Sequence, residues 1–487
     1  MTDGKVQPTE REQLRERCER EDVIMFINSC FAATRQNEYY TDLYRTSVSI
    51  EFLHRYVLIN YRLLYARTLA AGINHFNQQQ IIFNLLEAGA PADAAQRTEE
   101  GALIATALRK LPANRVYALF TRLQQNRVNN RRTRAVIKSY LAWRREPEFD
   151  AIKYRNKYRA AAAHIHSQLD EELGRFLFDR SSQKPYTTPL LNQYRQAQYS
   201  AAAIYELPFT VAESLAQKHK VPRDVFLKKI EPKMTAAEKL RLQSTAARTK
   251  GVEIEFDLSR AGLTKLALYI LSLKQNVRTA RADELQAALE AAANKTLARA
   301  PLSLGRVATI LDRSRSATGS REKRNRPLAV ALAASSLLRS AATEYRAFWT
   351  PAREEKSFEF LTYAAGQTAL AEPLLDALEW RPDLIVIVSD GYENDPPQLV
   401  DQVARVYRAA IGKAETPEIV HMNPVFDADH YAPRRLGATI PTVGLRDAED
   451  IPIMLGFAKF TAGTATLEEL EQYLAFRVNR MLNSDGT

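Results

Sequence analysis

Carboxylate and hydroxyl residues occur at three places in the last third of this 487-residue sequence, in an order that suits a metal ion. The first is Asp312-Arg-Ser314-Arg-Ser316, the second ends at Thr368, and the third contains Asp390. All donors are oxygens, and such a set favours Mg²⁺, Mn²⁺ or Ca²⁺ over zinc or copper. We therefore predict a divalent-cation site, with Mg²⁺ preferred, and these ligands: Asp312, Ser314, Ser316, Thr368 and Asp390.

Two apolar runs predict the strands that position these residues. Residues 306–311 end just before Asp312, and residues 383–389 form a continuous β-branched run that is typical of a strand buried in a parallel sheet. Other elements alternate with them: helices at 327–340, 399–411 and 467–482, and strands at 418–425 and 439–445. This alternation predicts a doubly wound, Rossmann-like α/β domain over residues 301–487, which would bind ligands at the carboxyl ends of its strands.

The ordered set Asp-x-Ser-x-Ser, Thr, Asp resembles the metal-ion-dependent adhesion site of von Willebrand factor A domains, over about residues 304–485. The resemblance implies that Asp312, Ser314 and Ser316 form the first loop of the site, Thr368 the second and Asp390 the third. A plainer alternative is that Asp312 and its serines cap the following helix.

Basic residues surround this motif and depart from the usual pattern. Arg313 and Arg315 stand where small or apolar residues are usual, and further along the chain come Arg321, Lys323, Arg324 and Arg326. This basic rim would either repel a metal or attract an acidic partner or a phosphate.

The first 300 residues differ from the rest in charge and in pattern. They carry 47 Lys and Arg against 32 Asp and Glu, a net charge of +15, whereas residues 301–487 carry 21 against 25, a net charge of −4. Consecutive helix-length apolar patterns with short turns predict an α-helical repeat region (an α-solenoid), with a plain helical bundle as the alternative. We predict two domains, residues 1–300 and 301–487, and we expect the first to contact a polyanion.

The basic segment, residues 109–145, has 11 Lys and Arg and no Asp or Glu. Arg127, Arg131, Arg134 and Lys138 have the spacing of one helix face, and Lys153, Arg155, Lys157 and Arg159 follow in the next helix. Tyr140, Trp143, Tyr154 and Tyr158 lie among them and are available to stack on unpaired bases. We predict a nucleic-acid contact; the alternative is a basic surface without a specific partner, with the aromatic residues in the core.

The combination of a basic helical region and an A domain resembles the TROVE-module family, the Ro autoantigens and their bacterial relatives. Arg131-Arg-Thr-Arg-Ala-Val-Ile-Lys138 and Lys153-Tyr-Arg155 look like that family's Arg-rich helix and Lys-Tyr-Arg segment. The RNA-binding residues that we predict from the basic segments and this resemblance are Arg127, Arg131, Arg132, Arg134, Lys138, Lys153, Arg155, Lys157, Arg159 and His164.

The resemblance implies HEAT-like helices in a ring that the A domain closes. It also implies an RNA-binding scaffold for quality control or processing, which binds small Y-type RNAs and the single-stranded ends of misfolded RNAs and works alongside an exoribonuclease in bacteria.

Composition and missing motifs exclude several other classes of function. Two cysteines exclude a disulfide scaffold and a four-cysteine zinc site, and no apolar run is long enough for a membrane span or a signal peptide. We expect a soluble cytoplasmic protein that is not an enzyme, because no catalytic motif and no general base for a metal-dependent nuclease is evident. The main alternative is a metal-dependent adaptor that binds a protein, for example an AAA+ ATPase, through the A domain.

Overall fold

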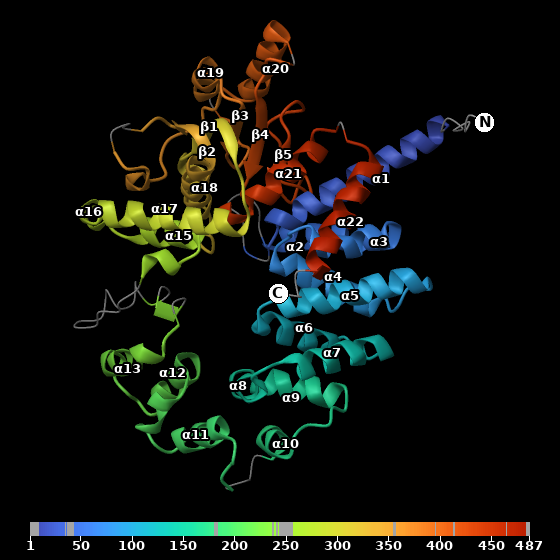
Figure 1. Cartoon of the computed structure of the whole chain (residues 1–487), viewed down its shortest axis with the longest axis vertical. Helices are drawn as coiled ribbons and strands as arrows, with labels where there is room; N and C mark the ends of the chain where they lie inside the picture. The colour runs from blue at the N-terminus through green and yellow to red at the C-terminus, as the bar shows by residue number, and fades with distance from the viewer. Residues whose placement is uncertain are drawn as a thin grey trace. The chain divides into compact units, whose positions relative to one another are not determined.

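The computed structural model describes residues 9–34, 36, 43–179, 184–235, 238–239, 242, 257–353, 357–394, 396–412, 414–463 and 465–483. The chain forms two compact units: residues 1–81 with 262–487 (unit 1), and residues 82–261 (unit 2). The first strand begins close to the predicted boundary at residue 301, but helices from the predicted N-terminal domain belong to unit 1. Figure 1 shows the elements of both units.

Unit 1 contains a five-stranded parallel sheet in the order β2-β1-β3-β4-β5. The strands are β1 (Leu304–Asp312), β2 (Ala342–Thr350), β3 (Leu384–Val388), β4 (Glu418–Asn423) and β5 (Thr442–Gly444). The strand order turns back between β1 and β3, because the chain first adds β2 on one side of β1 and then β3 on the other. Such a switch point leaves a crevice at the carboxyl ends of the two strands.

Helices cover both faces of this sheet. They are α18 (Arg326–Ala341), α19 (Ala371–Glu379), α20 (Leu399–Ile411) and α21 (Ile451–Thr461), whereas α22 (Leu467–Asn483) packs on the N-terminal helices of the same unit. On one face, Ile310 and Ile387 pack with Leu374 of α19 and Val400 of α20 in a single buried cluster. The other face receives α18, which is apolar on all sides because it is buried along nearly its whole length.

The predicted Rossmann-like architecture is confirmed, with one strand missed. β2 reads Ala-Thr-Glu-Tyr-Arg-Ala-Phe-Trp-Thr, and most of its residues are exposed or half-buried. It is an edge strand, so it lacks the continuous apolar run that identified β3.

Helices from both sides of unit 2 in the sequence pack within unit 1. Before unit 2 these are α1 (Glu10–Ala32), α2 (Leu43–Asn60), α3 (Arg62–Arg67) and the start of α4 (His75–Glu87); after it they are α15 (Leu263–Ser272), α16 (Gln275–Ala280) and α17 (Ala282–Arg299). α1 contacts β5, and α15 and α17 contact α18.

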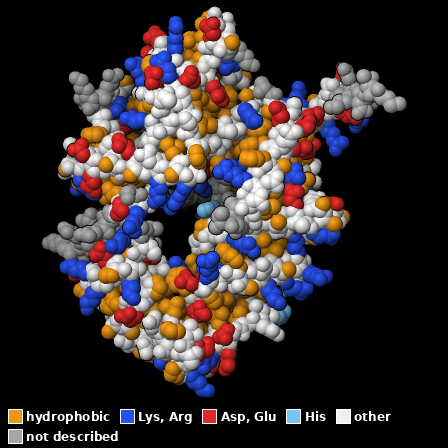
Figure 2. Space-filling model, in the orientation of Figure 1, with side chains coloured by type: hydrophobic (Ala, Val, Ile, Leu, Met, Phe, Trp, Pro, Cys, Tyr) orange, Lys and Arg blue, Asp and Glu red, His pale blue; other side chains and the backbone are white. Residues whose placement is uncertain are grey.

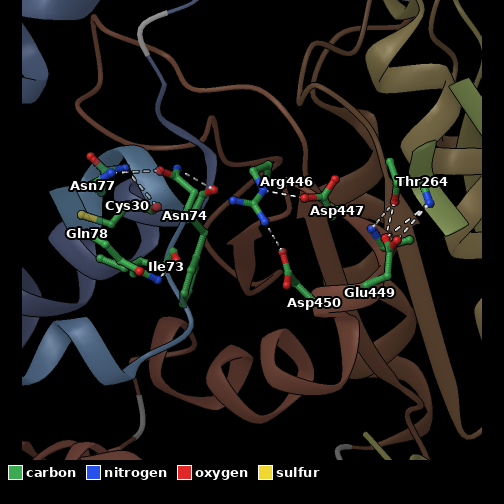
Figure 3. Close-up of polar contacts among 12 residues, drawn as sticks. Cys30, Ile73, Asn74, Asn77, Gln78, Thr264, Arg446, Asp447, Glu449 and Asp450 are labelled. Atoms are coloured by element: carbon green, nitrogen blue, oxygen red, sulfur yellow. Dashed lines mark hydrogen bonds and ion pairs between the residues drawn. The ribbon is translucent and has the colours of Figure 1, made fainter. Parts of the chain in front are cut away.

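Polar contacts fix these helices to the α/β domain, and Figure 3 shows the contact between Thr264 and Glu449. The amide of Asn28 in α1 donates to Thr442 O at 2.9 Å and accepts from Gly444 N at 2.6 Å. The hydroxyl of Thr264 in α15 donates to Glu449 Oε2 at 2.6 Å. Each bond joins residues that are more than 180 positions apart, so neither is visible in the sequence.

Unit 2 is helical throughout the residues described. Its helices are α5 (Ala94–Lys110), α6 (Ala113–Gln125), α7 (Arg131–Trp143), α8 (Pro147–Lys153), α9 (Arg155–His164), α10 (Glu171–Phe178), α11 (Pro189–Ala197), α12 (Phe209–Lys218) and α13 (Arg223–Ile230). α6 packs on α9, α5 on α7, and α8 on α9 to α12. This pattern of contacts between near neighbours in sequence is that of helical repeats, as predicted. None of the helices in the described part of the chain is long and apolar enough to cross a membrane.

We predict that Asn28→Ala lowers the free energy of unfolding of unit 1 by about 2–3 kcal/mol, because it removes two buried hydrogen bonds at the sheet edge and leaves backbone groups without partners. Urea unfolding followed by circular dichroism measures this change. Asn60→Ala, at an exposed residue of α2, is the matched control and should change stability by less than about 0.5 kcal/mol. Equal effects of the two changes would contradict the prediction.

Candidate functional site

Asp312 is the last residue of β1 and lies in the crevice beside β3. Its side chain is nearly buried, with a relative exposure of 4%. The N–H of Ser314 donates to Asp312 Oδ1 at 2.7 Å, and the hydroxyl of Ser389 donates to Oδ2 at 3.0 Å. The carboxylate is therefore held in one orientation by the turn that follows it and by the end of the neighbouring strand.

The serines of the motif lie in the turn after Asp312. The hydroxyls of Ser314 and Ser316 are 3.0 Å apart. Ser314 precedes a short 3-10 helix (η5, Arg315–Thr318), but its side chain makes no capping hydrogen bond there. The next α-helix begins only at Arg326, after Asn325. The alternative that these serines serve as helix caps is therefore wrong for Ser314, whose side chain contacts the carboxylate of Asp312 instead.

Thr368 and Asp390 complete the predicted set. Thr368 is fully buried, and its hydroxyl has no hydrogen-bond partner among the residues that the structure describes. Asp390 is 5% exposed and accepts from Tyr392 N at 3.1 Å. Burial and the negative charge of Asp390 raise the pKa of Asp312 to about 7. The two carboxylates therefore lie close enough for the charge of one to affect the other.

These residues fit a divalent cation. Two nearly buried carboxylates are stabilised by a positive charge, and a buried hydroxyl without a partner among the described residues has oxygen lone pairs available for a cation. The described residues contain no group of three or more His, Cys, Asp or Glu side chains that could hold a metal. A cation here would accordingly depend on two carboxylates and on hydroxyl oxygens, the donor set that the sequence predicts.

Arg313 does not face the cluster of oxygens. It is 9% exposed, and its guanidinium donates to Tyr363 O at 3.1 Å and to Ala352 O at 3.0 Å. It also lies over the ring of Tyr363, at 5.2 Å. Arg313 therefore holds two loops together, and of the two arginines inside the motif only Arg315 is exposed.

Sequence reasoning missed two residues that support the site. Ser389 is not among the predicted ligands, yet its hydroxyl bonds the carboxylate of Asp312. The amide of Asn423, at the end of β4, donates to Asp390 O and to Arg434 O, both at 3.0 Å. The position of both at strand ends was the available signal.

In unit 2 the structure corrects the predicted four-cation helix face. Asn130 caps α7, since its side chain accepts from Thr133 N at 2.9 Å. Arg127 therefore lies outside the helix, in the turn after α6, with a φ of 58°. Arg131, Arg134 and Lys138 do lie on α7 and are exposed.

Three of the predicted RNA-binding residues make contacts within the protein. Arg132 pairs with the fully buried Glu100 at 2.9 Å. Arg155 donates to Phe176 O at 2.6 Å and lies 4.6 Å from the ring of Phe176. His164 Nε2 is 3.0 Å from Val128 O. These contacts give each of the three residues a structural role that does not involve RNA. That they bind RNA stays a prediction.

The remaining cations of the second helix differ in environment. Lys153 lies over the rings of Phe149 and Tyr154, at 5.3 and 5.7 Å. Lys157 is exposed, whereas Arg159 is half-buried.

The aromatic residues of this region are mostly core residues. Tyr140 and Tyr158 are 4% and 2% exposed, so the prediction that they stack on bases is wrong. Tyr154 packs against Tyr117, with ring centroids 5.1 Å apart. Trp143 is 39% exposed and keeps an accessible ring. The apolar positions of amphipathic helices explain this burial better than base stacking.

The doubly wound parallel sheet, with oxygen donors at the carboxyl ends of β1 and β3, fits a von Willebrand factor A domain. No family model and no curated protein matches the chain. Among solved structures, it is similar to the crystal structure of the Deinococcus radiodurans Ro (RSR) protein, with a TM-score of 0.45 and 15% sequence identity, over 91% of this chain and 100% of that chain.

We predict that millimolar Mg²⁺ raises the thermal midpoint of the protein, because only the folded state assembles the oxygen donors. At one hundred times its dissociation constant, a bound ion stabilises by about 2.7 kcal/mol. Asp312→Asn should abolish the response and leave the metal-free protein at least as stable as the parent, since it removes one of two close buried charges.

Differential scanning calorimetry in Mg²⁺ and in EDTA measures both effects. Asp376→Asn, which changes an exposed carboxylate of α19, should keep the full response. A parent protein whose midpoint does not move in Mg²⁺, Mn²⁺ or Ca²⁺ would show that the donors hold no cation.

A second prediction concerns His421, which is fully buried in β4 between Thr442 Oγ1 and Ser389 O, each at 3.1 Å. Burial lowers the pKa of His421 to about 4. Protonation therefore favours the unfolded chain, and the stability present above about pH 6.5 is lost as the pH falls.

Between pH 7 and pH 5 the loss from this residue should be about 2 kcal/mol. Urea midpoints at the two pH values measure it, and His421→Gln should reduce the difference. An unchanged difference in the variant would assign the acid sensitivity to other groups.

Proposed function

We propose that this protein is a Ro-like RNA-binding scaffold. It binds small structured, Y-type RNA through exposed cations of unit 2, holds the single-stranded ends of misfolded RNA, and acts in cytoplasmic RNA quality control or processing beside an exoribonuclease. It performs no catalysis itself, and its A domain carries a divalent cation, preferably Mg²⁺.

The observation that carries this proposal is a set of exposed cations without ion pairs on otherwise well-packed helices. Arg127, Arg131, Arg134, Lys138 and Lys157 are exposed, and none pairs with a carboxylate among the described residues. Figure 2 shows Lys and Arg side chains standing out on the surface of this part of unit 2. Cations that gain nothing from internal pairs are expected to face a polyanion, where each phosphate contact releases counterions.

A buried polar network gives these cations a rigid support. The carboxylate of Asp150 in α8 is fully buried; it accepts from both sides of the Arg144 guanidinium, with Nη2 to Oδ1 at 2.9 Å, and from the hydroxyl of Tyr117 at 3.0 Å. The network joins α6, α8 and the end of α7. Phosphate contacts on fixed helices lose less conformational entropy than contacts on a flexible tail.

We predict that Arg131→Glu with Lys138→Glu lowers the affinity for a structured RNA hairpin at least tenfold at 100 mM salt. It should also reduce the slope of log K against log salt by about 2, because two phosphate contacts are lost. Fluorescence anisotropy over a salt series measures both quantities.

Lys220→Glu with Lys228→Glu is the control, because both lysines are exposed in unit 2 away from α7. It makes the same change in net charge and should weaken binding less than threefold. Equal losses in the two variants would mean that only net charge matters, and no loss in either would overturn the proposed RNA contact.

The geometry of the oxygen donors supports a second candidate, a metal-dependent adaptor that binds a carboxylate of a partner protein such as an AAA+ ATPase. Two carboxylate ligands leave coordination positions on a divalent cation for such a group. This function requires a partner that copurifies only with metal present and that is lost in Asp312→Asn but kept in Arg131→Glu with Lys138→Glu. Purification without nuclease, followed by sequencing of any copurified RNA, distinguishes the two.

A further inference from the structure

The carboxyl edge of the sheet in unit 1 carries cations that the proposed RNA contact in unit 2 does not use. Arg315 lies in η5, and Arg321 and Arg324 lie in the loop between η5 and α18. All three are exposed, and none forms an ion pair with another residue of the described ranges. Glu322 is the one carboxylate of the same loop, so residues 319–325 keep a net positive charge.

The backbone of this loop is tightly folded. Asn325 N donates to Thr318 O at 2.7 Å, and Arg326 N donates to Lys323 O at 3.0 Å. Gly319 has a φ of 68°, and a Cβ there would lie 2.3 Å from Lys323 O. Arg326 is not one of these free cations, because its guanidinium pairs with Asp447. The cations of the loop therefore project from a fixed turn that follows the metal motif directly.

An exposed aromatic ring lies beside the same turn. Tyr363 is 57% exposed, and one face of its ring is covered by the guanidinium of Arg313. Ala365 N donates to Arg313 O at 2.8 Å, and Arg315 N donates to Gly366 O at 3.0 Å. These bonds place the segment of Tyr363 along the turn that carries Arg315. The ring is thus fixed from one side and open to solvent.

If a divalent cation is bound, the two carboxylates would balance its charge. The net charge of this surface would then come from Arg315, Arg321 and Arg324. A positive rim selects an anionic ligand. Carboxylates and phosphates both meet this condition, but an aromatic ring backed by an arginine is a stacking platform for a base. A run of Asp and Glu side chains has no flat ring that could stack on Tyr363. The combination of fixed cations and one open ring favours a nucleic acid with unpaired bases.

We propose that this edge of unit 1, which we name the rim, binds single-stranded RNA. Arg315, Arg321 and Arg324 contact successive phosphates, and a base stacks on the open face of Tyr363. The rim is separate in sequence and in compact unit from the cations of α7, so it adds a second RNA contact beyond the proposed function.

The test uses the full-length protein and a fluorescein-labelled twelve-nucleotide uridine RNA, in Mg²⁺ and in EDTA. The variant Arg315→Ala with Arg321→Ala and Arg324→Ala should lose about tenfold in affinity at 100 mM salt, with a salt slope smaller by about 2, as expected for three contacts to a single strand. Tyr363→Ala should lose about fivefold or more, while Tyr363→Phe keeps the affinity.

The matched control is Lys295→Ala with Arg299→Ala and Arg480→Ala, three exposed cations of the same unit outside the rim. It removes the same charge and should stay within twofold of the parent. All variants should unfold within a few degrees of the parent in calorimetry, which separates lost contacts from lost structure.

Two different RNAs distinguish a failure of the rim proposal from a failure of the RNA contact proposed for α7. The hairpin RNA reports on α7, and the uridine RNA is also measured in the Arg131→Glu, Lys138→Glu background, where the effect of the rim should persist. A rim variant that binds the uridine RNA as well as the control overturns the proposal, as does a parent that does not bind it. Loss of binding to a deca-glutamate peptide, with RNA binding intact, would replace it with an acidic protein partner.

Discussion

The reversal of strand order between β1 and β3 is the constraint on which the site in unit 1 depends. Because both strands are parallel and adjacent, their carboxyl ends meet, and Asp312 and Asp390 come together in a crevice that neither strand could form alone. Burial then makes the two charges unfavourable to each other, as the raised pKa of Asp312 shows. The hydroxyl of Ser389 bonds the carboxylate of Asp312, and the hydroxyls of Ser314 and Ser316 lie 3.0 Å apart in the turn that follows it. A cation bound here would reduce the electrostatic repulsion between the two carboxylates.

The helices at the two ends of unit 1 depend on that same sheet. Asn28 satisfies two backbone groups of the edge strand β5, which would otherwise be open to another chain. Thr264 bonds Glu449 just before α21 on the other side. The sheet therefore holds together segments that precede and follow the 180 residues of unit 2. This arrangement explains why the boundary between compact units does not coincide with the change in sequence pattern near residue 301.

In unit 2, burial separates cations with a structural role from cations without one. Arg132 and Arg144 each neutralise a fully buried carboxylate, and removal of either would leave an uncompensated charge in the core. Arg131, Arg134 and Lys138 lie on the same helix as Arg132, yet they remain exposed. The distinction follows from the phase of the helix, which turns 100° per residue and so directs neighbouring arginines to opposite environments. A charge count over the basic segment cannot make this distinction.

The sequence by itself determined the α/β character of the last third, because the β-branched run of β3 and the motif from Asp312 to Ser316 are local patterns. It also determined the helical character and net positive charge of the first 300 residues. Only the tertiary structure decided which arginines face solvent, that Tyr140 and Tyr158 are core residues, and that Arg313 turns away from the carboxylates. It also decided that β2 pairs with β1. These outcomes depend on contacts between residues far apart in the chain, and a local pattern carries no information about which distant side chain will supply the partner.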